Sequence, residues 1–279
     1  MNTIFLKQIE LHQEWLKDNN KGKQLNLENC DLSGFDLEGL NLSYAILKNT
    51  KLIDAKINKT NFRHADLSNA IFTSLNKPRI IKADFSYANL NQTILENATF
   101  TNCCFDFASM EKINAEYTKF RFSSMLQTNL DNSEASFSIF ENVNLTNASM
   151  YNINLDHAEI SKTNMQCVNL QNAAINQTFL RESNISSADL RNAQLPVNFL
   201  QINRFHKFKN IKYPISVTYD ITNNKIYYYK WKHKNNSLRN FKKYIYQLYG
   251  PQSRTKNYTA LKELKAIIEM LCKIKRVMK

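Results

Sequence analysis

An apolar residue occupies every fifth position over most of this chain. The first run extends from Leu27 to Phe72, and a second run extends from Phe85 to Leu200. Within the second run, only Ala115 and Ala135 are not large and apolar. A helix returns to one face every 3.6 residues and a strand every two, so a period of five matches neither element. The pattern predicts that the chain makes the same bend after each short extended piece.

A smaller residue precedes most of these large apolar residues by two positions. It is usually alanine, as at Ala45 and Ala88, and elsewhere serine, threonine or cysteine, as at Thr118. Residues two apart in an extended segment face the same side. We therefore expect the small and the large residue to point inward, and the other three positions, which are mostly polar, to face water.

Several five-residue units follow one motif closely. They read Ala65-Asp66-Leu67-Ser68-Asn69, Ala88-Asn89-Leu90-Asn91-Gln92 and Ala188-Asp189-Leu190-Arg191-Asn192. This pattern resembles the pentapeptide-repeat family, whose motif is roughly A(D/N)LXX, over about residues 25–200. The resemblance implies an all-β solenoid, a right-handed quadrilateral β-helix with four pentapeptides in each coil.

Asparagines recur at the interval that such a coil requires. One set lies early in the repeat and another late, and the members of each are spaced by four pentapeptides, namely Asn29, Asn49 and Asn69, and then Asn132, Asn152, Asn172 and Asn192. Asparagine favours tight turns. Each set is therefore expected to stack on one corner of the coil.

The five-residue register slips between Phe72 and Phe85. This step of 13 residues leaves three extra residues, which a loop within 73–82 would house. Either the loop is a plain excursion between coils, or it contacts a partner through Lys77, Arg79 and Lys82. Projecting loops take part in target contact in the gyrase-protecting members of the family, and this loop resembles them only in kind.

The two ends of the chain differ from the repeat. Residues 1–24 contain a predicted helix at 2–18, with an apolar stripe that includes Phe5, Ile9 and Leu16. Because a solenoid exposes strand edges at its ends, we expect this helix to cap the first coil. Residues 201–279 are predicted to form a small α+β domain. Two strands are expected within 215–231, and helices at 238–249 and 259–277.

Charge is distributed unevenly along the chain. Residues 201–279 hold 19 Lys and Arg against 3 Asp and Glu, whereas residues 25–200 hold 14 against 18. The net charge of +13 therefore comes from the C-terminal domain. Its basic and aromatic side chains alternate as in proteins that bind nucleic acid without sequence preference. Candidate anion-binding residues are Lys230, Trp231, Lys232, Lys234, Arg239, Lys242 and Lys243. An acidic protein or the solenoid itself is the alternative partner.

Signals of catalysis and of membrane insertion are weak. The five cysteines show no metal-ligand spacing, and the four glycines form no phosphate-binding loop. We therefore predict no catalytic residues, no metal and no cofactor. No apolar run reaches the length of a membrane span or a signal peptide, which favours a cytoplasmic protein, with delivery into another cell as an effector as the alternative.

Binding residues are instead sought on the outer surface of the solenoid. Acidic residues recur on two shared faces, the first with Glu96, Glu116 and Asp156 and the second with Glu111 and Asp131. Each set is either a solvated surface or a binding face. Outward aromatic residues align in two pairs, Tyr87 with Phe107 and Tyr117 with Phe137. These rings are covered by the C-terminal domain or a dimer mate, or they contact a partner, since aromatic residues are enriched at interfaces.

Three functions are compatible with this organisation. The first is a non-enzymatic adaptor, effector or inhibitor that binds an unidentified protein on a rigid platform. The second, implied by the resemblance, is mimicry of duplex DNA toward DNA gyrase or another DNA-binding protein. A net charge of −4 over residues 25–200 weakens it, because duplex DNA carries one charge per ~1.7 Å. The third is nucleic-acid binding through residues 201–279, whose last helix is also a candidate for homodimer formation.

Overall fold

The computed structural model describes residues 3–73, 78–175 and 177–185, and positions 188, 189, 191, 193 and 194. Beyond these it describes the backbone of four strands. The chain begins with helix α1 (Thr3–Lys17). Ten strands follow, namely β1 (Arg79–Ile81), β2 (Thr99–Thr101), β3 (Lys119–Arg121), β4 (Ile139–Glu141), β5 (Glu159–Ser161), β6 (Phe179–Arg181), β7 (Leu200–Asn203), β8 (Ile215–Asp220), β9 (Lys225–Lys230) and β10 (His233–Asn235).

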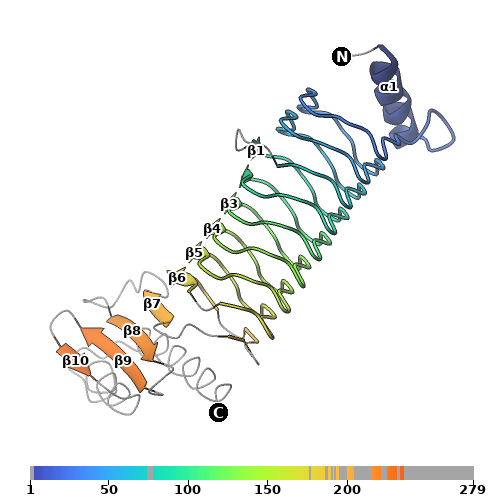
Figure 1. Cartoon of the computed structure of the whole chain (residues 1–279). Helices are drawn as coiled ribbons and strands as arrows, with labels where there is room; N and C mark the ends of the chain where they lie inside the picture. Colours follow the sequence, from blue (N-terminus) through green and yellow to red (C-terminus); the bar gives the residue numbers. More distant parts are fainter. Residues whose placement is uncertain are drawn as a thin grey trace.

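The repeat forms a quadrilateral parallel β-solenoid (Figure 1). Its four faces are four columns of parallel bridges between residues one coil apart. The first, second and fourth faces begin with Asn26–Ile46, Asp31–Lys51 and Asn41–Asn61. The third begins with Asp36–Lys56, and strands β1 to β6 pair in parallel along it, each one coil after the last. The predicted fold class and the coil of four pentapeptides are confirmed.

Each corner of the coil contains a residue with positive φ, two positions after the buried apolar residue. Asparagine fills many of these positions, including Asn29, Asn49 and Asn132. It tolerates the left-handed region better than other non-glycine residues. The amide side chains also bond between coils, since Asn49 Nδ2 donates to Asn29 Oδ1 at 2.8 Å. Asparagine therefore specifies the bend that a five-residue period requires.

The inside of the solenoid is filled by the repeat's own side chains. The fourth and third faces each carry an internal stack of phenylalanine rings. Phe85 stacks on Phe62 and Phe105 with ring centroids 5.1 and 4.9 Å apart. The small inward position is buried as well, and its hydroxyl groups find carbonyl acceptors. Thr118 Oγ1, for example, donates to the Leu95 carbonyl of the preceding coil at 2.8 Å.

The register slip adds three residues to a single coil. Across it, bridges join Asn61 to Asp84 and Ile71 to Ile94, three positions further apart than bridged residues elsewhere. Later bridges, such as Asp84–Cys104, return to the regular spacing. The extra length lies between Ile71 and β1. All four faces continue past it, because every later residue is displaced by the same three positions.

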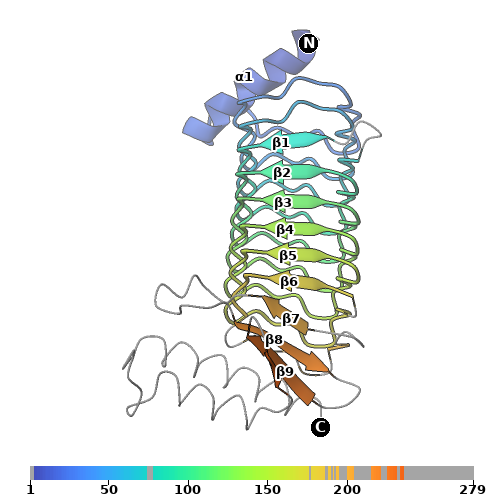
Figure 2. The same ribbon diagram turned by 90° about the vertical axis from the view of Figure 1, so that its left-hand side faces the viewer.

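Helix α1 lies across the N-terminal end of the solenoid (Figure 2). Its buried residues are Phe5, Ile9 and His12. The Phe5 ring meets Phe35 edge-on at 5.4 Å, and the Leu25 amide donates to His12 Nδ1 at 3.1 Å. The predicted capping helix is confirmed. In the described part of the chain no helix has the length and apolar content needed to cross a lipid bilayer.

The third face continues beyond the repeat. Strand β7 pairs in parallel with β6 through Arg181 and Asn203, which stand two positions further apart than partners in successive regular coils. Strands β8, β9 and β10 then add in antiparallel order (Figure 1). The two strands predicted within 215–231 are thus present. The helices predicted at 238–249 and 259–277 lie outside the described residues.

Candidate functional site

The register slip brings two basic residues to the outer surface. Arg79 begins β1 and is exposed, and Lys82 is exposed at the next corner with a φ of 59°. Lys77, the third candidate there, lies outside the described residues. The binding role of this loop stays a prediction.

The predicted pair Tyr87 and Phe107 belongs to a longer column of rings. Tyr44, His64, Tyr87 and Phe107 occupy the same corner of successive coils, between the fourth and the first face. Successive centroids lie 4.7, 4.9 and 4.8 Å apart with interplanar angles of 8°, 13° and 6°. We call these four residues the first ladder. The Trp15 ring of α1 meets Tyr44 edge-on at 6.4 Å, so the column of rings reaches the cap.

Ladder residues adopt a backbone conformation that aromatic residues rarely take. The φ angles of Tyr44, Tyr87 and Phe107 are 61°, 60° and 61°. Such a φ costs an ordinary L-residue about 1–2 kcal/mol. The rings are only partly buried in return, since Tyr87 and Phe107 remain 44% and 40% exposed. Stacking offsets part of the cost, at about 0.5–1.5 kcal/mol for each pair.

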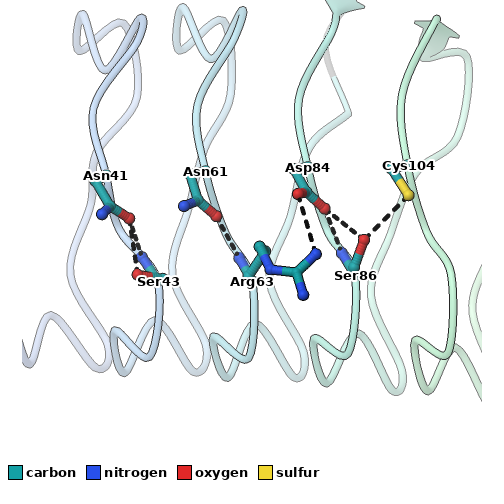
Figure 3. Close-up of polar contacts among 7 residues, drawn as sticks. All are labelled: Asn41, Ser43, Asn61, Arg63, Asp84, Ser86 and Cys104. Atoms are coloured by element: carbon teal, nitrogen blue, oxygen red, sulfur yellow. Dashed lines mark hydrogen bonds and ion pairs between the residues drawn. The ribbon is translucent and has the colours of Figure 1, made fainter. Parts of the chain in front are cut away.

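A regular polar framework lies beside the first ladder (Figure 3). In successive coils the side chains of Asn41, Asn61 and Asp84 accept the backbone amide two residues later, at 3.2, 3.0 and 2.9 Å. Arg63 adds a charged contact. Its Nη1 lies 3.4 Å from Asp84 Oδ2, and its guanidinium carbon lies 5.4 Å from the centre of the Tyr87 ring. This framework fixes the base of the ladder.

The predicted pair Tyr117 and Phe137 forms a second, separate ladder with His157. The two centroid distances are 5.0 and 4.7 Å, and the interplanar angles are 12° and 4°. We call these three residues the second ladder. It occupies the corner between the second and the third face, diagonally opposite the first ladder and nearer the C-terminal end of the solenoid.

The candidate acidic residues line two corner columns, where several bond to the next coil. Asp131 Oδ1 accepts the Tyr151 amide at 2.9 Å, and Asp156 Oδ1 accepts the Gln177 amide at 2.9 Å. Glu111 pairs with the neighbouring Lys112 at 2.9 Å. Glu116 and Glu96 each accept one side-chain hydrogen bond, from Ser136 Oγ and Asn97 Nδ2. Asp131, Asp156 and Glu116 thus help to hold the coils together, whereas the carboxylates of Glu111 and Glu96 each bond to the adjacent residue.

The described residues offer little reactive chemistry. They contain no group of three or more His, Cys, Asp or Glu side chains able to hold a metal ion. Burial raises the pKa of the Cys103 thiol to about 11, so at neutral pH the thiol stays protonated and unreactive. Burial also raises the pKa of Cys104, although Ser86 Oγ donates to its sulfur at 3.0 Å. Both behave as packing residues.

The predicted anion-binding residues fall in the C-terminal sheet and beyond it. Lys230 ends β9 and Lys234 lies in β10, where the backbone alone is described. The remaining five lie outside the described residues: Trp231, Lys232, Arg239, Lys242 and Lys243. Anion binding there stays a prediction.

Sequence reasoning found two aligned pairs but missed the length of both ladders. The slip hides the step from His64 to Tyr87, which is three positions longer than a regular coil. His64 and His157, which the repeat places outward, stack between or beside aromatic rings. A search for any flat side chain one coil away, with three positions added across the slip, would have found them.

Comparison with known proteins agrees with this architecture. A family model described as pentapeptide repeats matches eight copies, over residues 24–58, 45–76, 80–114, 138–173 and 163–196. Together these segments cover more than half of the chain. A comparison with curated proteins finds no match.

Solved structures of three repeat proteins are also similar. HetL, a pentapeptide repeat protein involved in heterocyst differentiation regulation in the cyanobacterium Nostoc, is 21% identical over 68% of this chain and 94% of that protein, with a TM-score of 0.36. QnrB1, a plasmid-mediated fluoroquinolone resistance protein, is 16% identical over 58% and 91%, with a TM-score of 0.29. A pentapeptide repeat protein of the Arabidopsis thaliana thylakoid lumen is 19% identical over 43% and 68%, with a TM-score of 0.28. Because the family model matches repeat units over more than half of its length, this chain belongs to the pentapeptide-repeat family.

Proposed function

We propose that this protein is a non-enzymatic interaction protein that binds a partner protein along the first ladder. The observation that carries the proposal is the column of four stacked rings at one corner. Many other corners use asparagine, which fits the backbone with less strain. Rings that are both strained and exposed suggest a role in contact, because strained residues concentrate at functional sites.

The stacking determines which part of each ring a partner meets. Neighbouring rings cover one another's faces, so the outward surface consists of ring edges and the hydroxyl groups of Tyr44 and Tyr87. Tyrosine suits this position because it combines a large apolar area with a hydrogen-bonding end. Because the interior is filled, specificity rests on this outer surface.

Affinity purification with matched variants tests the proposal. Tyr87 and Phe107 are both replaced by asparagine, the residue that many other corners carry. Phe122→Asn is the control, because Phe122 is an exposed aromatic residue at a corner, with a φ of 51°, and stacks on no ring among the described residues. We expect the affinity of the captured partner, measured with purified proteins, to fall about tenfold or more in the double variant.

The control should keep the wild-type affinity. If the double variant binds every captured protein as tightly as the wild type does, the first ladder is not the binding surface. The circular dichroism of both variants checks that the solenoid is intact.

DNA mimicry is the second candidate, supported by the column that carries Glu96, Glu116 and Asp156. It is the weaker candidate because basic residues interrupt the negative charge on the neighbouring third face, where Arg121 of β3 pairs with Glu141 of β4 at 3.2 Å. A gyrase supercoiling assay with the intact protein separates the two. Inhibition or protection of gyrase that survives the double ladder variant would favour mimicry.

Nucleic-acid binding through residues 201–279 is the third candidate and rests on the charge of that segment. Titration of the full chain with duplex DNA and with single-stranded RNA at increasing salt tests it. Phosphate contacts predict a steep fall of affinity with salt. Absence of binding at low salt would eliminate this candidate.

A further inference from the structure

The second ladder presents a different surface from the first. Its rings take the same strained corner backbone, with φ angles of 56° at Tyr117 and 57° at Phe137. These two rings are 47% and 44% exposed. No arginine lies over them among the described residues, whereas carboxylates do stand beside them. The two ladders therefore offer different chemistry at opposite corners of the solenoid.

Three carboxylates next to the second ladder have no cationic partner among the residues that the structure describes. Glu116 directly precedes Tyr117, and Glu96 holds the equivalent position one coil earlier. Glu134 lies on the second face, and Ser136 links it to Glu116. The Ser136 amide donates to Glu134 Oε1 at 3.0 Å, and its hydroxyl donates to Glu116 Oε1 at 3.1 Å. Every ion pair found within the described residues involves other carboxylates.

These carboxylates keep capacity for further hydrogen bonds. A carboxylate accepts about four hydrogen bonds. Glu96 and Glu116 each receive one, and Glu134 receives two, the second from Asn154 Nδ2 at 2.9 Å. All three are half-buried, so they are held in place while part of each remains accessible. Lys119 in β3 stands beyond the ladder on the third face and pairs with none of them.

We propose that the second ladder and these three carboxylates bind a lysine- and arginine-rich segment of a partner protein. Ammonium and guanidinium groups would donate to the remaining lone pairs of these carboxylate oxygens, since charge-assisted hydrogen bonds are the strong ones. The aliphatic stems of the same side chains would cover the edges of the Tyr117 and Phe137 rings. This surface is separate from the first ladder, so the inference goes beyond the function proposed above.

The net charge of the protein does not attract this occupant, so any attraction must come from the local carboxylates. At +13, the molecule as a whole repels a basic segment. If such a segment binds, the cause is therefore the local charge complementarity of the site and not the net charge of the protein. An acidic or neutral segment would leave the three carboxylates without partners.

Fluorescence anisotropy with the full-length protein tests the proposal. The probe is a labelled peptide of alternating arginine and glycine, and a glutamate–glycine peptide of equal length is the reference. We expect the basic probe to bind and the acidic one not to bind. Glu116→Gln/Glu134→Gln should weaken the basic probe by about tenfold or more, because glutamine keeps the shape and loses the charge. Tyr117→Asn/Phe137→Asn should weaken it as well.

Two controls make the result specific. Glu111→Gln/Glu141→Gln changes the net charge equally but removes carboxylates that already pair with Lys112 and Arg121. Phe122→Asn removes an exposed ring elsewhere. Both should bind the basic probe as the wild type does.

Three outcomes would overturn the proposal. They are no binding of the basic probe by the wild type, equal loss in the charge control, and cross-links from position 117 to residues 236–279 of this chain or of a second copy. The last would make the protein's own basic segment the occupant. Failure of this test leaves the first-ladder experiment unaffected, because that experiment uses other residues and another readout.

Discussion

At the scale of single residues, the corner positions carry most of the information about this solenoid. The same backbone conformation is filled by glycine at Gly34 and Gly39, by asparagine at many corners, and by aromatic rings at the two ladders. Glycine and asparagine accept this conformation at low cost, whereas aromatic residues do not. A column of aromatic residues at one corner therefore needs an explanation beyond the turn itself, whereas a single ring such as Phe122 forms no column.

Gly22 is a positive-φ residue with a stricter requirement. Its φ is +65°, and a Cβ atom there would lie 2.1 Å from the Leu11 carbonyl oxygen and 2.8 Å from the Trp15 nitrogen. We expect Gly22→Ala to displace α1 and to lower the free energy of unfolding by more than about 2 kcal/mol, from steric overlap added to strain. Thermal and urea unfolding measure this loss.

Gly34→Ala is the matched control. Gly34 has a similar φ of +72°, but a Cβ atom there would meet nothing within 4 Å. The cost should be limited to strain, about 1 kcal/mol. Equal losses in the two variants would show that contact with α1 does not constrain Gly22.

Where the repeat is regular, the sequence largely predicted which side chains are buried. The alternation of small and large inward residues gave most of the buried set, including Thr118 and Ala88, although Cys30 and Ala55 are only partly buried. The ladders were only half predictable, because contact between rings depends on coil length and one coil has three extra residues. A histidine such as His64 also gives no apolar signal, although its flat ring stacks as tyrosine does.

At the scale of elements, α1 depends on one buried histidine. His12 is fully buried, and its Nδ1 accepts the Leu25 amide, which joins the cap to the first coil. Burial lowers the pKa of His12 below its ordinary value of 6.5, against a smaller opposing effect of the Ser43 backbone. The folded state therefore favours the neutral ring, and a protonated Nδ1 would no longer accept the Leu25 amide.

Stability of the cap should fall in mild acid. Because the pKa of His12 is lower in the folded state than in the unfolded state, its contribution is complete above about pH 6.5 and is lost as the pH falls through the folded pKa. We expect hydrogen exchange at Leu25 and in α1, corrected for intrinsic rates, to speed up between about pH 7.5 and about pH 5. His12→Gln should remove this dependence. His64→Asn should keep it, and an unchanged exchange profile in the wild type would refute the role of His12.

The capping helix was predictable because its stripe of Phe5 and Ile9 has helical spacing. The strands β8 and β9 were predictable from their residue types. The connection of β7 to β6 was not. Periodicity identifies inward residues, but it does not determine which sheet edge a following hairpin joins. The pairing of Arg181 with Asn203 also breaks the regular coil spacing on which the prediction rested.

At the scale of the whole molecule, stability comes from contacts between neighbouring coils. Phe85 has no exposed surface, stacks on Phe62 and Phe105, and meets Phe72 and Phe100 edge-on at 6.2 and 6.0 Å. It thus links three successive coils. In a solenoid each coil contacts only its neighbours, so a weak coil destabilises the interfaces on both sides of it.

Removing this ring should have a large effect. We expect Phe85→Ala to lower the free energy of unfolding by about 3–5 kcal/mol, the usual cost of a phenylalanine cavity. Phe122→Ala, which removes an exposed ring, should change it by about 0.5 kcal/mol or less. Urea titration followed by circular dichroism compares them. A small loss in Phe85→Ala would mean that the neighbouring coils close over the cavity.

The direction of the hydrogen bonds between coils has a mechanical consequence. Bonds such as Leu27 N to the Ile46 carbonyl and Leu47 N to the Asp66 carbonyl join one coil to the next, along the length of the solenoid. Tension between the two ends of the solenoid therefore breaks the hydrogen bonds between one pair of adjacent coils at a time. Each released coil would free about 70 Å of extended chain. A solenoid stretched between two anchored partners would lengthen in steps at low force, and would act as an extensible tether instead of a stiff strut.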